Sequence, residues 1–224
     1  MSPPSAAYTR FFIAAILALI ALGCESYGAA AVSNLSDFNN GDYPVNQSSP
    51  YAQGRAEPFT TGSDPTILVS ATLAMDSFNA TNNGGFTVSL FSNDSGLPGT
   101  SLLALSGPGT PQASGNYTYT APSSFTLQPN TTYWIVAQVP LTGPDTYYNW
   151  TFTVNSAFTG LPGWSMGASA SSVSFMGWAP SWGPQSMPLR MELDVTPAPE
   201  PGAATLLVIA GLVPVAARRR TRGR

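Results

Sequence analysis

The sequence of 224 residues contains no histidine and no lysine, and it has a single cysteine. Histidine is the usual general base of enzymes and the commonest transition-metal ligand, so Ser-His-Asp and Cys-His catalysis are not open to this chain. Basic side chains are also scarce: between positions 32 and 196 only Arg55 and Arg190 stand against nine acidic residues. Nucleic-acid binding depends on basic side chains that neutralise phosphates. The body of the chain is therefore acidic, and we expect no nucleic-acid partner.

The end of the chain combines three features in a fixed order. Pro199, Glu200 and Pro201 come first, an apolar run of about 15 residues follows at 203–217, and an arginine cluster closes it. The cluster begins with Arg218, Arg219 and Arg220. A comfortable membrane-spanning helix needs about 20 apolar residues, and fixed positive charge resists crossing the membrane. We expect a short transmembrane helix that holds the chain temporarily, with its arginines on the cytoplasmic side.

This three-part end closely resembles the PEP-CTERM sorting signal of exported bacterial proteins. The resemblance covers residues 197–224. It implies that an exosortase-like enzyme in the inner membrane cuts near the Pro-Glu-Pro motif and releases the body or attaches it again. An ordinary C-terminal tail anchor is the alternative interpretation.

The start of the chain has the order of a secretory signal peptide. Arg10 precedes 13 almost purely apolar residues at 11–23, and small residues follow at 28–31. This pattern predicts a signal peptide over residues 1–31, with cleavage after Ala30 or Ala31. The secretion machinery and a signal peptidase are then partners of the chain.

The single cysteine, Cys24, lies inside the predicted signal peptide. Lipidation of its thiol, as in a lipoprotein, is one interpretation. However, Ala21 stands three positions before it, where lipoprotein signals usually carry a large aliphatic residue. We therefore expect Cys24 to leave with the signal peptide. The mature chain then has no cysteine, so disulfides play no part in its stability even though export would permit them.

Between these two segments the composition is typical of short strands joined by turns, with 21 glycines, 21 prolines and 11% aromatic residues. Residues 32–51 show little periodicity and are predicted to be an irregular lead-in. Residues 132–139 are apolar on both faces, which indicates a central strand buried between two layers. Period-two alternation predicts further strands, among them 66–76 and 187–195. In the first of these, the residues expected on one face are Ile67, Val69, Ala71, Leu73 and Met75.

Eight to ten such strands predict one all-β domain over residues 52–196, an antiparallel β-sandwich of jelly-roll type. The N-terminal signal helix and the short C-terminal transmembrane helix flank it. The middle of the body also resembles the choice-of-anchor R domain, on the segments 86–92, 96–99, 105–107, 117–120 and 130–134. That resemblance implies a β-rich extracellular module whose relatives carry different sorting signals. It leaves the activity open.

Two groups of oxygen-bearing side chains are candidates for function, one for binding calcium and one for catalysis. Asn93 and Asp94, next to Ser95, could offer oxygens to calcium in a loop, whereas the alternative is a turn in which these side chains bond their own backbone. Glu192 and Asp194 share one face of a strand, as a glycosidase-like pair of carboxylates would. The strand period places them on the solvent side, so we interpret them as a solvated face.

Three tryptophans, Trp164, Trp178 and Trp182, lie in a loose region rich in glycine and proline. Exposed indoles there could form a stacking platform for sugar rings, and buried aromatic caps are the alternative. Trp134 and Trp150 lie within strong strand patterns and are predicted to be core residues.

The sequence thus predicts a non-enzymatic, exported bacterial protein of the cell envelope or extracellular matrix. Its expected role is structural or adhesive, among extracellular polysaccharide, with the C-terminal helix as a transient anchor in the inner membrane. No cofactor is expected, apart from the calcium alternative. A carbohydrate- or calcium-binding extracellular module and a glycosidase-like enzyme are the rival hypotheses.

Overall fold

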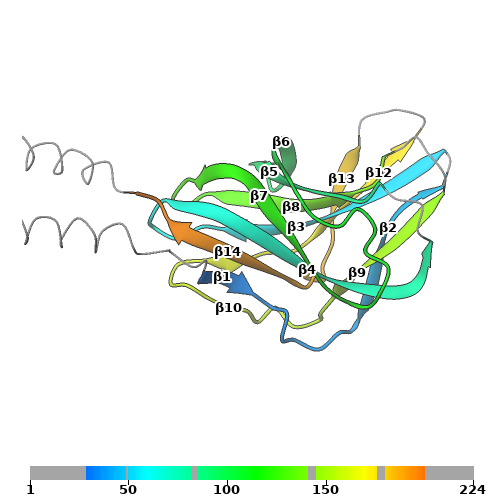
Figure 1. The fold of residues 1–224 in the computed structure, drawn as a ribbon, viewed down its shortest axis with the longest axis horizontal. Coiled ribbons are helices and arrows are strands. Elements are labelled where there is room, and N and C mark those ends of the chain that lie inside the picture. The colour runs from blue at the N-terminus through cyan, green and yellow to red at the C-terminus, as the bar shows by residue number, and fades with distance from the viewer. Residues whose placement is uncertain (1–28, 49, 82–84, 141–144, 176–179, 200–224) are drawn as a thin grey trace, which may run out of the picture.

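The computed structural model describes residues 29–48, 50–81, 85–140, 145–175 and 180–199. This part of the chain is all-β and contains no helix, as the composition predicts (Figure 1). Its strands are β1 (Ala29–Ser33), β2 (Gly41–Ser48), β3 (Tyr51–Thr60), β4 (Thr66–Thr81), β5 (Thr87–Asp94), β6 (Leu97–Leu105), β7 (Gly115–Leu127), β8 (Thr132–Gln138), β9 (Thr146–Phe152), β10 (Thr159–Gly160), β11 (Ser165–Met166), β12 (Ala170–Phe175), β13 (Ser181–Pro184) and β14 (Met191–Pro197). Among these residues, no helix is long and apolar enough to span a membrane.

The strands form one antiparallel sheet with the order β10-β1-β14-β4-β9-β2-β3-β8-β5-β6. Strand β7 pairs with β4, strands β11 and β12 pair with β3, and β13 pairs with β12. Ser106, just after β6, and Thr120 of β7 exchange two backbone hydrogen bonds of 2.8 Å. Because β7 also pairs with β4, the pairings run around a closed ring: β4, β9, β2, β3, β8, β5, β6 and β7.

The main core contains the largest buried side chains, among them Trp150, Tyr119, Tyr148 and Phe59. A second, smaller cluster on the other side of β3 and β8 contains Ala56, Trp134, Val136 and Ala170. Strand β8 contributes to both clusters, because its odd positions face the first and its even positions the second. The predicted central strand, buried on both faces, is confirmed, and so are the core positions of Trp134 and Trp150.

The expected face of β4 is wrong in its first half. Leu68 is buried, whereas Ile67 and Val69 are only half-buried. The pairing of β4 with β7 shifts register between Leu68 and Ser70, and such a bulge inserts one extra residue and exchanges the faces. From Ala71 onward the predicted face is correct, because Ala71, Leu73 and Met75 all belong to the main core.

The irregular lead-in at 32–51 is also wrong, because it contains the end of β1 and all of β2. Strand β2 pairs with β9 from Gly41 to Gln47 and connects β9 to β3 in the sheet. Its sequence is poor in β-favouring residues, and only Val45 and Gln47 are buried. Pairing with β9 therefore outweighs the weak local preference of β2. The predicted signal peptide (1–31) and sorting signal (197–224) lie outside the described residues except for positions 29–31 and 197–199, and both expected helices fall entirely outside them.

Candidate functional site

The two ends of the body are neighbours. Strand β1 starts at Ala29, which lies opposite Val195 of β14 in an antiparallel pair. After β14, the backbone N–H of Ala198 donates to the carbonyl of Pro65 at 3.2 Å, and Pro199 is exposed. Figure 1 shows β1 and β14 side by side, in blue and orange. The Pro-Glu-Pro motif therefore begins directly after the last residue held by the sheet, while Glu200, Pro201 and Arg218–Arg220 lie outside the described residues.

The predicted signal-cleavage site lies within β1. Ala30 is exposed, whereas Ala31 is completely buried, and its carbonyl accepts a hydrogen bond from the Leu161 N–H at 2.9 Å. Cleavage after Ala30 keeps this acceptor. Cleavage after Ala31 removes it together with the first three residues of β1. Cys24 lies outside the described residues.

The tryptophans of the loose region do not share one platform. Trp164 is buried in the main core, and its ring is stacked on Phe59 with centroids 6.1 Å apart. Trp182 is half-buried against the second cluster, and Trp178 lies outside the described residues. An exposed sugar-stacking role for Trp164 is therefore wrong, and burial accounts for this residue.

The loop candidate for calcium is a turn between β5 and β6. The Asn93 side-chain carbonyl accepts a hydrogen bond from the Trp134 indole N–H at 3.0 Å, and Asp94 accepts one from the Ser95 hydroxyl at 3.2 Å. The chain then turns through Ser95 and Gly96 with positive φ angles of 53° and 85°. No group of three or more His, Cys, Asp or Glu residues that could hold a metal occurs in the described ranges.

This geometry gives a test of the calcium alternative. Asn93→Ala should lower the free energy of unfolding by about 1 kcal/mol, because the Trp134 N–H loses its acceptor. The loss should be the same with millimolar calcium and with a chelator, measured by urea unfolding. Calcium that stabilises the wild type but not the Asn93→Ala variant would contradict the turn interpretation.

Glu192 and Asp194 are half-buried on β14, on the face opposite to the core residues Leu193 and Val195. Asp194 accepts a hydrogen bond from the Ser70 hydroxyl at 2.9 Å. The acidic residues are not all at the surface, however. Glu57 of β3 is completely buried, a feature that the sequence analysis missed.

Residues 185–190, the crossing segment, join β13 to β14. Glu57 contacts this segment. One carboxyl oxygen of Glu57, Oε2, accepts a hydrogen bond from the Leu189 N–H at 2.8 Å. The other, Oε1, is buried and has no hydrogen-bond partner among the described residues. Burial raises the pKa of Glu57 well above its usual value, and the Leu189 bond lowers it by less. The fold therefore favours the neutral carboxyl.

Other polar groups fix the crossing segment from both sides. The Ser169 hydroxyl donates to the Met187 carbonyl at 2.6 Å, and the Arg190 N–H donates to the Thr151 carbonyl at 2.9 Å. The Asn34 amide donates to the Leu189 carbonyl at 3.1 Å. The segment is thus bonded to Glu57 of β3, to Thr151 of β9, and to Ser169 and Asn34, which lie directly before β12 and directly after β1.

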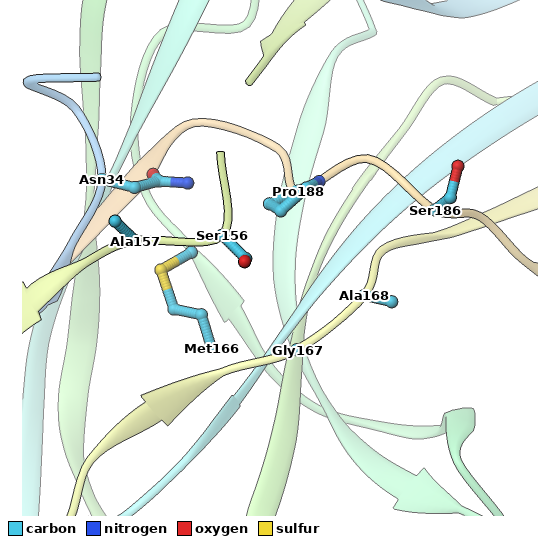
Figure 2. A pocket seen from close by; sticks show the side chains of 8 residues that line it. All are labelled: Asn34, Ser156, Ala157, Met166, Gly167, Ala168, Ser186 and Pro188. Carbon is cyan, nitrogen blue, oxygen red and sulfur yellow. The ribbon is translucent and has the colours of Figure 1, made fainter. Parts of the chain in front are cut away.

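Two hollows flank the crossing segment, and Ser186 lines both. The first, of about 270 Å³, is lined by Asn34, Ser156, Ala157, Met166, Gly167, Ala168, Ser186 and Pro188. Figure 2 shows Asn34 and Ser186 at opposite ends of this hollow, and none of its lining side chains is ionisable. The second hollow, of about 520 Å³, is more open and is lined by Tyr43, Pro184, Gln185 and Ser186.

Comparison with known proteins adds no family to these observations. No protein-family model matches the sequence, and no curated protein matches it. The resemblances to the PEP-CTERM signal and to the choice-of-anchor R domain therefore stay predictions.

Proposed function

We propose that this chain is an exported bacterial protein of the cell envelope or extracellular matrix, with a structural or adhesive role and no catalytic one. A secretory signal peptide directs export. The C-terminal segment holds the chain in the inner membrane until an exosortase-like enzyme cuts near Pro199. The body is a β-sandwich of jelly-roll type, in which the closed ring of pairings is flattened into two layers.

One observation supports this proposal more than any other: the first and last strands of the body, β1 and β14, are neighbours in the sheet. Ala29 and Val195 are opposite each other in the β1–β14 pair, so both predicted targeting segments attach to the same end of the body. A single membrane surface can then engage both segments while the sheet folds on the outer side. Attachment at opposite ends of the body would prevent that arrangement.

The Pro-Glu-Pro motif is also well placed for a processing enzyme. Backbone pairing with β4 extends to Pro197, Ala198 makes the last hydrogen bond, and Pro199 is exposed. Cleavage at this position leaves every residue of β14 in the sheet. The proposal therefore requires no unfolding of the body for processing.

Exchanging Arg218, Arg219 and Arg220 together for serine tests the sorting signal. This change lowers the fixed positive charge of the cluster from five arginines to two, Arg222 and Arg224, and should let the C-terminal segment slip across the membrane, so the processed fraction in the native host should fall at least about tenfold. Intact-mass spectrometry of the envelope and the medium measures this fraction. A matched variant with three lysines keeps the charge and should be processed like the wild type. Equal processing of the serine and lysine variants would contradict the proposal.

A further inference from the structure

The walls of the first hollow are held in place by hydrogen bonds. On one side, the Asn34 side chain donates from Nδ2 to the Leu189 carbonyl at 3.1 Å and accepts at Oδ1 from the Met191 N–H at 2.7 Å. On another side, the Gly167 N–H donates to the Pro58 carbonyl at 3.4 Å. A hollow with fixed walls can take up a ligand without a large ordering cost.

Much of the lining is apolar and accessible. Met166 of β11, Ala157, Ala168 and Pro188 contribute apolar side chains to it. Met166 is half-buried, and both alanines are exposed. Figure 2 shows the Met166 thioether directed into the hollow, on the same side of the view as Ala157. None of the described residues that line the hollow is aromatic, so a sugar ring cannot stack on an aromatic face here.

Two serine hydroxyls add hydrogen-bonding groups to this lining. Ser156 and Ser186 both line the hollow and are exposed, and neither hydroxyl is bonded to a residue that the structure describes. Each hydroxyl can therefore donate to a ligand and accept from it. A ligand that covered them without offering partners would strip them of water, which is unfavourable.

These properties together select the class of ligand. A charged ligand would lose its hydration without gaining a counter-charge, because no lining residue is ionisable. A pure hydrocarbon would leave the serine hydroxyls unpaired, and a plain hexose has no methyl group for the apolar wall. The volume of about 270 Å³ is just below the range of about 300–1,000 Å³ that is typical of small-molecule sites. The hollow therefore suits a single neutral unit that has both a methyl group and hydrogen-bonding groups.

We propose that the first hollow binds the acetamido group of an N-acetylated amino sugar. The acetamido methyl group packs against the Met166 thioether and Ala157, and the Ser156 hydroxyl donates to the acetamido carbonyl. The sugar ring extends toward Ser186, whose hydroxyl bonds a ring hydroxyl. The ligand is either a unit of an amino-sugar polysaccharide or a free amino sugar. The first source rests on the proposed function, whereas the binding chemistry does not.

Binding is tested by titrating the purified full chain in detergent micelles, with isotope-labelled methionine methyl groups observed by NMR. The signal that is missing in Met166→Leu identifies the Met166 methyl group. N-acetylglucosamine should shift this signal in a saturable way, with half-saturation at a concentration at least about tenfold lower than for glucose. The signal of Met75, which lies in the main core, should stay in place.

The same titration with tri-N-acetylchitotriose distinguishes the two sources. Half-saturation at a lower concentration than for N-acetylglucosamine, counted per sugar unit, identifies a polysaccharide as the source. Equal half-saturation per sugar unit identifies a free amino sugar. Both results support the site.

Two variants locate the binding within the hollow. Ala168→Leu places a larger side chain at an exposed position of the wall, so it should fill the hollow and weaken N-acetylglucosamine binding at least about tenfold. Ser156→Ala removes the proposed donor and should weaken binding severalfold. Ala113→Leu makes the same exchange at an exposed alanine that does not line the hollow, and it should bind like the wild type. Circular dichroism confirms the fold of each variant.

Three results overturn the inference. They are a Met166 signal that N-acetylglucosamine does not move, equal titration with glucose, and full affinity in folded Ala168→Leu or folded Ser156→Ala. Because binding to the purified chain does not depend on export, a negative result leaves the processing proposal standing.

Discussion

Replacing Trp150 with alanine is expected to lower the free energy of unfolding by about 3 to 5 kcal/mol, as for other large buried aromatic residues. Trp150 of β9 is completely buried in the main core and lies opposite both Tyr43 of β2 and Met75 of β4. Its indole N–H donates to the Arg190 carbonyl of the crossing segment at 2.9 Å. The alanine variant therefore leaves a cavity where three strands meet and removes one of the two donors to the Arg190 carbonyl, the other being the Ala74 N–H at 3.1 Å.

Two controls separate these contributions, with unfolding followed by far-ultraviolet circular dichroism in urea. Trp150→Phe keeps most of the ring volume but removes the N–H, so it should lose less stability than the alanine variant, mainly through the one hydrogen bond that is lost, since the Ala74 N–H still donates to the Arg190 carbonyl. Val154→Ala alters a side chain that is 62% exposed, and its effect should stay within about 0.5 kcal/mol. A loss below about 1 kcal/mol for Trp150→Ala would contradict the central position of this residue.

Replacing Glu57 with glutamine should stabilise the protein above neutral pH. The folded pKa of Glu57 is raised by burial, so the folded chain holds this proton more tightly than the unfolded chain. The stability that this difference contributes is fully present below the unfolded pKa and is lost as pH rises toward the folded pKa. Glutamine stays neutral at every pH and can still accept from the Leu189 N–H. The expected gain at pH 8 is on the order of 2 kcal/mol, because the unfolded glutamate is ionised at this pH and folding must either protonate it or bury its charge, whereas glutamine requires neither.

The pH profile of unfolding distinguishes Glu57 from other acids. Burial and the nearby Asp76 also raise the pKa of Asp42, so this residue contributes a change of the same sign. Asp42→Asn should therefore flatten the profile only slightly, since this side chain is much less buried, whereas Glu57→Gln should remove most of the decline between pH 5 and pH 8. If Glu57→Gln leaves the profile unchanged, the buried carboxyl is not coupled to folding.

Much of the fold could be predicted from the sequence, because strand periodicity is a local signal. The central strand β8 and the core positions of Trp134 and Trp150 follow from apolar residues whose spacing alone places them inside. Strand β2 could not be predicted in this way. Its residues are polar, and it is a strand because β9 and β3 pair with its backbone. The bulge in β4 likewise depends on β7, whose residue Thr120 is 50 positions away from Ser70.

The polar interior was missed for a similar reason. Alternation from the apolar Phe59 places Glu57 and Arg55 on the inward face of β3, and this signal could have identified both residues. Their partners could not be inferred, since Leu189, which donates to Glu57, is 132 positions away. For Trp164, the glycine and proline around it left both exposure and burial open, and its burial with stacking on Phe59 decides between them.

Intact-mass spectrometry of the protein recovered from the envelope and the medium of its native host tests the central proposal most directly, because one mass reports both ends of the chain. The proposal predicts a chain that begins near Ala31 and ends near Pro199. The hydrogen bond that the Leu161 N–H donates to the Ala31 carbonyl favours a mature chain that starts no later than Ala31. A C-terminus retained through Arg224 would contradict the sorting signal and indicate a tail-anchored membrane protein, and added lipid mass on Cys24 would indicate a lipoprotein.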